Sequence, residues 1–339
     1  MAAPINDWLA QTVEPTLEPD LSICDPHHHF WDQRPDRVEP RYMLDQLMAD
    51  TGSGHNIVST VFVEARSMYR DGASDEMRPV GEMEFVQGIA AQSASGIYGN
   101  TRAAHGIVGH ANLHLGSNVR PVLEALRAAS PNRFSGIRHG VGWDPHPEIA
   151  SPGAYPFPNQ LASDHYRAGA RVLAEMNLSL DVSCLHPQLP EVADFARAVP
   201  DLTIVLNHVG GLMRTGPYAS NPDETMANWR AGIAAAASAP NVVLKLGGVG
   251  MARTGFDWHQ RSTPVGSEEV ATSIDPIMRY CIEQFGPSRC MFESNFPVDK
   301  ESFSYHVMWN AFKRMSADFS ASERADMFHD CAARAYRLG

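Results

Sequence analysis

The sequence lacks long apolar runs and clustered cysteines, and these absences exclude several classes of protein. No stretch of about 18 apolar residues is present, so we expect no membrane-spanning helix. The N-terminus, MAAPINDWLA, does not follow the charged-then-apolar order of a signal peptide. The five cysteines are scattered without C-x-x-C spacing, as expected of small buried residues in a reducing compartment. Together these features predict a cytoplasmic protein.

Positive charge is also scarce. The chain has 27 lysines and arginines against 39 acidic residues, a net charge of −12. The resulting field repels phosphate backbones, which argues against nucleic acid as a partner. No G-x-G-x-x-G opens a helix and no Walker sequence occurs, so nucleotide binding has no support. A small-molecule substrate is the partner that remains, and the composition leaves homo-oligomerisation open.

Potential chemistry is concentrated in residues 21–32, LSICDPHHHFWD. Side chains alternate faces along a strand, so we expect Asp25, His27 and His29 on one face and His28 on the other. A His-x-His pair can deliver two imidazole nitrogens to one ion, typically zinc. We therefore interpret His27 and His29 as catalytic residues or metal ligands. The alternative is a pair of hydrogen-bonded structural histidines.

Eight short apolar runs alternate with helical stretches after a polar arm at residues 1–20. Nearly every run ends in a polar or ionisable residue, which is typical of a (β/α)8 TIM barrel with its site at the C-terminal face of the strands. A doubly wound open sheet is the alternative, but it would gather such residues at one switch point. We predict one α/β barrel domain over residues 21–339, with long loops at that face. The predicted strands are the run that opens at residue 21 and those at 56–63, 106–110, 134–139, 178–184, 202–206, 241–246 and 290–295.

Seven motifs follow one another at the predicted strand ends: DPHHHFWD, VFVEARSMY, FSGIRH, LHPQL, LNHVGG, VVLKLGG and MFESNFPVDK. In this order they resemble the amidohydrolase superfamily, in particular amidohydrolase-related family 2 and its branch of 2-pyrone-4,6-dicarboxylate lactonase and L-fuconolactonase. The resemblance runs from about Ser22 to Leu338. It implies a barrel hydrolase whose site contains His27, His29 and His208.

One position departs from the family pattern. Asn295, in the sequence SNFP at residues 294–297, stands where the family carries its catalytic aspartate. An amide supplies neither negative charge nor a base, so we predict that the site works without a tightly bound metal. A divalent metal, zinc in the first place, is the alternative, with His27 and His29 as ligands.

Other ionisable residues near the strand ends are candidates for the base and for substrate binding. Lys245 lies in an apolar strand and needs a partner, because an unpaired buried charge costs several kcal/mol. We expect a structural ion network beneath the site. As the alternative, we predict that Lys245 or Arg138 holds a substrate carboxylate or polarises a carbonyl. The general base is open among His208, Glu293 and Asp299, and further candidates for the substrate pocket are Glu64, His186 and Trp31.

These features predict a hydrolase that opens a lactone or related cyclic ester of a small organic acid, with a carboxylated lactone as substrate. Water would attack the carbonyl carbon, His27, His29 or a metal would polarise the oxygen, and the base would take the proton. The alternatives are a metal-dependent decarboxylase of an aromatic or unsaturated acid, and a non-catalytic ligand-binding relative.

Overall fold

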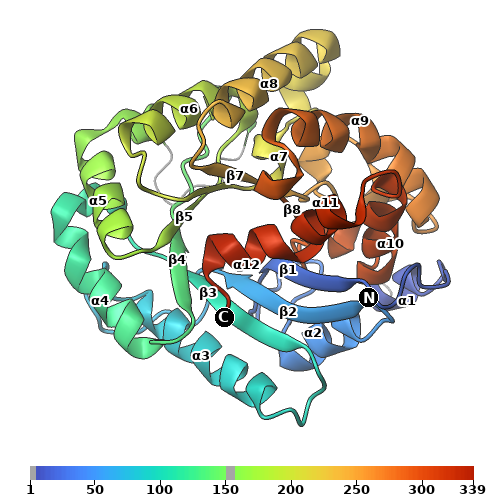
Figure 1. Ribbon diagram of the computed structural model, residues 1–339, viewed down its shortest axis with the longest axis horizontal. Coiled ribbons are helices and arrows are strands. Elements are labelled where there is room, and N and C mark those ends of the chain that lie inside the picture. The colour runs from blue at the N-terminus through green and yellow to red at the C-terminus, as the bar shows by residue number, and fades with distance from the viewer. Residues whose placement is uncertain (1–4, 150–156) are drawn as a thin grey trace.

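The fold is the predicted (β/α)8 barrel. The computed structural model describes residues 5–149 and 157–339, and within them eight parallel strands form one sheet in sequence order (Figure 1). The sheet closes on itself, because the His29 N–H donates to the Phe296 carbonyl at 2.8 Å and the Asn295 N–H to the His27 carbonyl at 2.9 Å. The strands are β1 (Ser22–His28), β2 (Asn56–Val63), β3 (Arg102–Gly109), β4 (Phe134–Arg138), β5 (Ser179–Val182), β6 (Ile204–Leu206), β7 (Val242–Leu246) and β8 (Cys290–Phe292).

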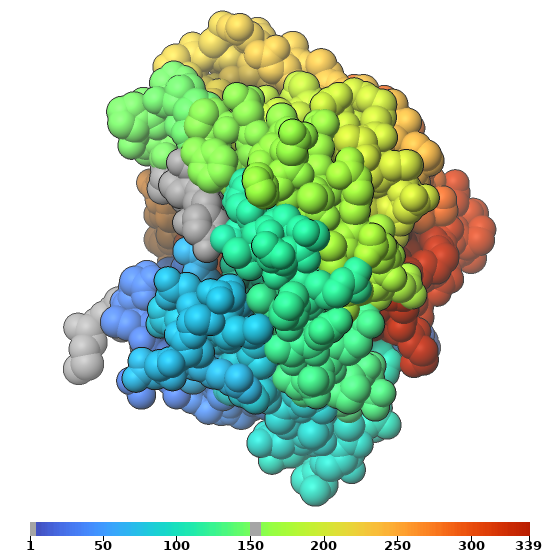
Figure 2. All heavy atoms as spheres, turned by 90° about the vertical axis from the view of Figure 1, so that its left-hand side faces the viewer, coloured from blue at the N-terminus to red at the C-terminus, as the bar shows by residue number. Residues whose placement is uncertain are grey.

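Helices surround the barrel. Chain order runs round the outside, and Figure 2 shows this succession from the side, with the green middle part of the chain facing the viewer. The predicted arm carries the short helix α1, and its residues 1–4 lie outside the described part. No helix in the described residues is long and apolar enough to cross a membrane. The helices are α1 (Ile5–Leu9), α2 (Leu44–Thr51), α3 (Val80–Ala94), α4 (Arg120–Ala129), α5 (Asp164–Glu175), α6 (Leu189–Ala198), α7 (His208–Gly211), α8 (Pro222–Ala237), α9 (Ser267–Phe285), α10 (Tyr305–Met315), α11 (Ala321–Ala325) and α12 (Cys331–Tyr336).

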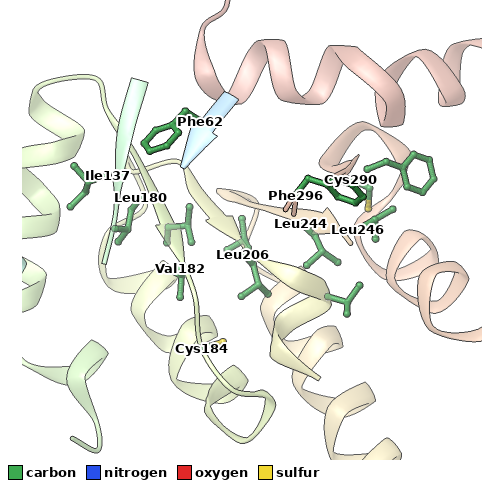
Figure 3. Close-up of a cluster of buried hydrophobic side chains, with 14 of the residues drawn as sticks. Phe62, Ile137, Leu180, Val182, Cys184, Leu206, Leu244, Leu246, Cys290 and Phe296 are labelled. Carbon is green, nitrogen blue, oxygen red and sulfur yellow. The ribbon is translucent and has the colours of Figure 1, made fainter. Parts of the chain in front are cut away.

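Strand alternation produces two apolar layers. Leu244 and Leu246 of β7 belong to the outer layer, which packs between the strands and the surrounding helices (Figure 3). Lys245, between them in sequence, points into the barrel. The inner layer is small and includes residues of α12, which crosses the middle of the barrel in Figure 1. Its members are Cys24, Val61, Val63, Val108, Val205, Met291, Cys331, Ala332, Ala335 and Tyr336.

Helix α12 closes the barrel at the N-terminal ends of the strands. Next to it, a Cβ built on Gly106, in the middle of β3, would lie 2.8 Å from a methyl carbon of Leu338. Burial of an apolar side chain contributes about 1.5–3 kcal/mol, so this plug is a substantial part of the core. The ionisable side chains of the interior, such as Lys245 and Glu293, lie toward the opposite, C-terminal end of the strands, whereas beside the plug the polar groups are hydroxyls such as that of Ser135.

Strand β1 contains a bulge. In its ladder with β2, Asp25 pairs with Thr60 and His28 with Phe62, so an advance of three residues in β1 matches two in β2. An extra residue in one strand bends it and changes which side chains face inward. The simple alternation that we predicted therefore does not hold across the bulge.

The prediction that Asp25 shares a face with the histidines was wrong for this reason. Asp25 points outward, and its carboxylate accepts a 3.0 Å hydrogen bond from the hydroxyl of Tyr305 in α10. Beyond the bulge the predicted phase holds. His27 and His29 point into the barrel, whereas His28 points outward and packs on an outer-layer phenylalanine ring.

Candidate active site

A pocket of about 280 Å³ opens at the C-terminal ends of the strands. All eight strands contribute to it, either with their last residues or with the loops that follow. Six of the predicted site residues line it, namely His29, Trp31, Glu64, Arg138, His208 and Asn295. The remaining lining residues are Arg34, Arg37, Ala65, Arg66, His110, Gly140, Ser183, Met251, Arg253 and Val298.

Two of the pocket histidines have a fixed tautomer. The Nδ1 atom of His29 lies 2.8 Å from the Val63 carbonyl, and that of His110 lies 3.0 Å from the Arg138 carbonyl. A carbonyl oxygen only accepts, so both rings donate from Nδ1. Burial lowers the pKa of both imidazoles. Each ring is therefore neutral at neutral pH, with Nε2 as a hydrogen-bond acceptor.

The third pocket histidine, His208, forms a dyad with Glu293. Its Nδ1 atom lies 2.7 Å from Glu293 Oε1, which also accepts the backbone N–H of His208 at 3.2 Å. Burial lowers the pKa of His208 well below its ordinary value and raises the pKa of Glu293 to about 8. Gly248 makes room for the ring, since a Cβ there would lie 2.6 Å from it. This geometry is that of a carboxyl group that orients an imidazole base.

His27 lies beneath the pocket and is fully buried. Its Nδ1 atom is 2.7 Å from Glu293 Oε2 and 3.2 Å from Lys245 Nζ, and its Nε2 atom is 3.4 Å from Arg138 Nη1. Burial lowers the pKa of His27, and the charge of Lys245 lowers it further. His27 is therefore a neutral ring between one carboxyl group and two cations.

Lys245 is part of a closed network under the pocket. Its ammonium lies 2.8 Å from Asp181, which also accepts hydrogen bonds from the Tyr336 hydroxyl at 2.9 Å and the Asn207 amide at 2.9 Å. The predicted pairing of Lys245 is confirmed. Its predicted contact with substrate has no geometric support, because Asp181 holds it below the pocket. We call His27, Asp181, Lys245, Glu293 and Tyr336 the floor of the site.

Asn295 reaches the pocket in a left-handed conformation, with φ of 54°. Its amide donates to Asp299 Oδ1 at 2.7 Å, and the Gly250 N–H donates to Asp299 Oδ2 at 2.8 Å. Burial raises the pKa of Asp299 to about 8. Asp299, a predicted base, thus lies behind Asn295 with both oxygens engaged, and does not line the pocket.

His186 was predicted at the barrel mouth, but it lies elsewhere. It lines a separate cavity together with Tyr218, whose ring centroid is 4.8 Å from that of the imidazole. The Met213 N–H donates to its Nδ1 atom at 3.4 Å and orients the ring away from the pocket.

The pocket is strongly cationic, although the chain carries a net charge of −12. Glu64 is its one acidic lining residue, and Arg138 neutralises it through a 2.8 Å ion pair. Burial acts to raise the pKa of Glu64, but Arg138 and other nearby cations outweigh it and the pKa is lowered. The five lining arginines are Arg34, Arg37, Arg66, Arg138 and Arg253.

Among the described residues, two of the five pocket arginines, Arg66 and Arg253, make no side-chain hydrogen bond or ion pair; Arg66 is exposed, whereas Arg253 is half-buried. Within residues 5–149 and 157–339 the Arg253 guanidinium makes no hydrogen bond or ion pair, and its Nε atom is buried. Its backbone is held in place, since the Arg253 carbonyl accepts the Arg214 N–H at 2.9 Å. The side chain is thus a positioned cation with open hydrogen-bonding capacity.

The sequence matches a family model described as amidohydrolase over residues 24–338. The chain belongs to the amidohydrolase family. A Sinorhizobium fredii relative, the uncharacterized protein y4mH, is 32% identical over 340 residues, which cover 94% of this chain and 99% of the relative. An L-fucono-1,5-lactonase of Burkholderia multivorans is 31% identical over 160 residues, 47% of this chain and 51% of that enzyme. A B. multivorans amidohydrolase solved with bound zinc has the same fold, with a TM-score of 0.71 at 23% identity, covering 94% of this chain and all of the other.

This amidohydrolase has a donor set that fits a metal ion. Ligand atoms of His27, His208 and Glu293 lie within 4.8 Å of one another. We had predicted His27 with His29, but His29 is not part of this group. Lys245 and Arg138 place positive charge beside His27, which opposes cation binding.

Ten of the sixteen lining residues were not predicted from the sequence, and His110 and Arg253 are the two that matter most for the chemistry. His110 follows β3 directly, so the rule that strand ends carry the site could have identified it. Arg253 lies in the loop after β7, seven residues beyond the strand, where no pattern distinguishes it from other loop arginines.

Proposed function

We propose that this enzyme hydrolyses a lactone or related cyclic ester that carries a carboxylate. The observation that supports this most directly is the pocket itself, in which five arginines face one neutralised acid beside an oriented imidazole. Guanidinium groups bind carboxylates through paired, charge-assisted hydrogen bonds. Arg253, with its hydrogen-bonding capacity open, is the group best suited to hold the substrate carboxylate.

In this proposal His208 is the general base. Glu293 holds the Nδ1 side of the ring, and Nε2 takes a proton from water as the water oxygen bonds to the carbonyl carbon. Arg138 and the Asn295 amide line the same pocket and can stabilise the oxyanion that forms. As the ring C–O bond breaks, protonated His208 returns the proton to the leaving oxygen. The product is a hydroxy acid with one more carboxylate than the substrate.

His27, His208 and Glu293 would hold a divalent ion, which would supply an electrophile for the carbonyl oxygen. We propose that hydrolysis does not require this ion. The amide of Asn295 offers no charge to a cation, and two cationic side chains flank His27.

The test is a panel of carboxylated lactones in weakly buffered solution with a pH indicator, with headspace analysis for CO₂. We expect release of about one proton per ester opened and no CO₂. Proton uptake with CO₂ release from an aromatic acid would support a decarboxylase instead. Binding without turnover across the panel would support a non-catalytic relative.

A further inference from the structure

A second cavity adjoins the pocket. Its volume is about 450 Å³, larger than the 280 Å³ of the pocket. It lies among the loops after β4, β5, β6 and β7. Its lining residues include Leu185, Met213, Thr215, Arg253, His259 and Gln260.

Arg253 belongs to the walls of both cavities. A substrate group bound by this guanidinium therefore lies at the boundary between them. Leaving a buried charged donor unsatisfied is unfavourable. Binding of a ligand anion at Arg253 would supply the hydrogen-bond partner that its buried Nε lacks among the described residues.

The second cavity contains another buried polar atom without a partner. Among the described residues, Nδ1 of His259 makes no hydrogen bond. Leu185 and Met213, both almost fully buried, supply apolar wall on the same cavity. The wall also carries polar groups, including the carboxylates of Glu148 and Asp257. Apolar wall beside a few placed polar groups is the usual composition of a small-molecule site.

The volumes of the two cavities also favour a ligand that occupies both. Ligand pockets are commonly about 300–1,000 Å³, so the first cavity accommodates one small acid ring and little else. The two cavities together fall well inside that range. A single ligand that occupies both cavities would contact Arg253, which lines each of them.

We propose that the second cavity is a substrate compartment, and that the enzyme takes carboxylated lactones bearing a second ring or a substituent of similar size. The carboxylate would pair with Arg253, the lactone would lie in the first pocket, and the substituent would lie against Leu185 and Met213. The reaction assigned to these substrates rests on the proposed function, whereas the way in which they bind does not.

The test compares two matched pairs of compounds. Paraconic acid and its γ-phenyl derivative are carboxylated γ-lactones that differ by one ring, and their hydrolysis gives kcat/KM. Succinate and phenylsuccinate differ by the same ring and cannot be hydrolysed, so calorimetric titration with them measures binding alone. We expect the phenyl member to be favoured by about tenfold or more in each pair, the usual range for filling an apolar pocket.

Two variants fill the second cavity. Gln260→Trp starts from an exposed side chain whose one hydrogen bond among the described residues goes to Asp257. Thr215→Phe provides a second change on another loop and gives up a long, 3.5 Å hydrogen bond from its hydroxyl to the Arg253 carbonyl, which the Arg214 N–H still holds. Each should abolish the preference for the phenyl member and leave the smaller member within about twofold. Gln11→Trp places the same indole at an exposed arm position that lines neither cavity, and should change nothing.

The outcomes separate the two proposals. If no lactone is hydrolysed but phenylsuccinate binds more tightly than succinate and loses that advantage in Gln260→Trp and Thr215→Phe, the compartment stands and the proposed reaction fails. Equal binding of the two acids by the wild type, unchanged by either variant, would overturn the compartment even if paraconic acid is hydrolysed. The compartment would also be overturned if both variants weakened binding of succinate and phenylsuccinate to the same extent.

Discussion

The floor of the site and the wall of the pocket use similar residues in opposite ways. In the floor, Lys245 and Asp181 are fully buried, and each has partners at hydrogen-bonding distance. In the wall, His29 and His208 are bonded through one nitrogen only, and Arg253 has no partner in the described chain. The polar groups of the floor have almost no hydrogen-bonding capacity left for a ligand, whereas those of the wall still have donors and acceptors that a ligand can use.

This difference separates structural from functional polar groups. Removing one member of a buried ion pair leaves an uncompensated charge in the core and costs about 3–5 kcal/mol. A buried polar group without a hydrogen-bond partner destabilises the free protein, and a ligand that supplies the partner removes this cost. Changes to the Lys245–Asp181 pair of the floor should therefore act on stability, and changes in the wall on activity.

The largest stability effect should come from Lys245→Met. It leaves the Asp181 carboxylate buried without its counter-charge, so we expect a loss of about 3–5 kcal/mol in urea unfolding. Arg253→Met removes a cation of the wall and is the matched control, with an expected change below about 1 kcal/mol because no partner is orphaned. Equal losses of unfolding free energy in Lys245→Met and Arg253→Met would contradict the distinction between floor and wall.

His208→Ala should have the largest effect on activity. Loss of a general base typically reduces kcat by about 10²–10⁴, and we expect about 10³ with an unchanged circular dichroism spectrum. His28→Ala is the control, because that ring points outward and bonds Thr60 at 2.8 Å. It should retain activity within about threefold while lowering the unfolding midpoint. An inactive but stable His28 variant would contradict the strand phase.

Metal dependence should be weak in the wild type. Activity should survive dialysis against a chelator, because Asn295 supplies no charge and Lys245 and Arg138 flank His27. Asn295→Asp adds a carboxylate and should raise zinc affinity by about tenfold or more. About one zinc per wild-type chain, with turnover lost on its removal, would show that His27, His208 and Glu293 hold an essential ion.

Glu82 provides a smaller, pH-dependent effect. It is buried, its Oε1 accepts the N–H groups of Ala65 and Ser67, and its Oε2 has no partner in the described residues. Burial, followed by the charge of Glu64, raises its pKa to about 8 from 4.5. The folded state thus binds more protons between pH 4.5 and 8, and the contribution of this group to stability falls as pH rises through that window.

Glu82→Gln imitates the protonated acid at every pH. It should be near neutral at pH 5 and stabilise the protein by roughly 1–2 kcal/mol at pH 8.5, measured as the difference in unfolding free energy at the two values. Glu84→Gln, on the exposed side of the same helix, is the control. A stabilisation at pH 5 as large as that at pH 8.5 would rule out the protonation argument.

Much of the fold could be predicted, because the apolar runs of a parallel barrel are visible in sequence. The run NIVSTVFV is β2 without any change of its bounds, and Lys245 lies inside β7 as expected. The bulge at residues 25–28 could not be predicted, since it depends on the register between two strands. It moved Asp25 to the outer face.

The site was harder to predict than the fold. A strand-end rule finds His29, Arg138 and His208, because position along the strand determines whether a residue reaches the mouth. It cannot tell which charges are satisfied. That depends on pairs far apart in the chain, such as Lys245 with Asp181, and it is why Arg253 was overlooked.

The most direct test of the account is the selectivity of the wall for an anionic substrate. Paraconic acid and γ-butyrolactone are matched lactones that differ by one carboxylate, and kcat/KM for both should be measured with the wild type and with Arg253→Met. We predict that the wild type prefers paraconic acid by about 10²-fold, and that Arg253→Met reduces this ratio about tenfold or more by raising KM for the acid alone. Equal kcat/KM for the two lactones in the wild type, or a ratio unchanged by Arg253→Met, would contradict the account.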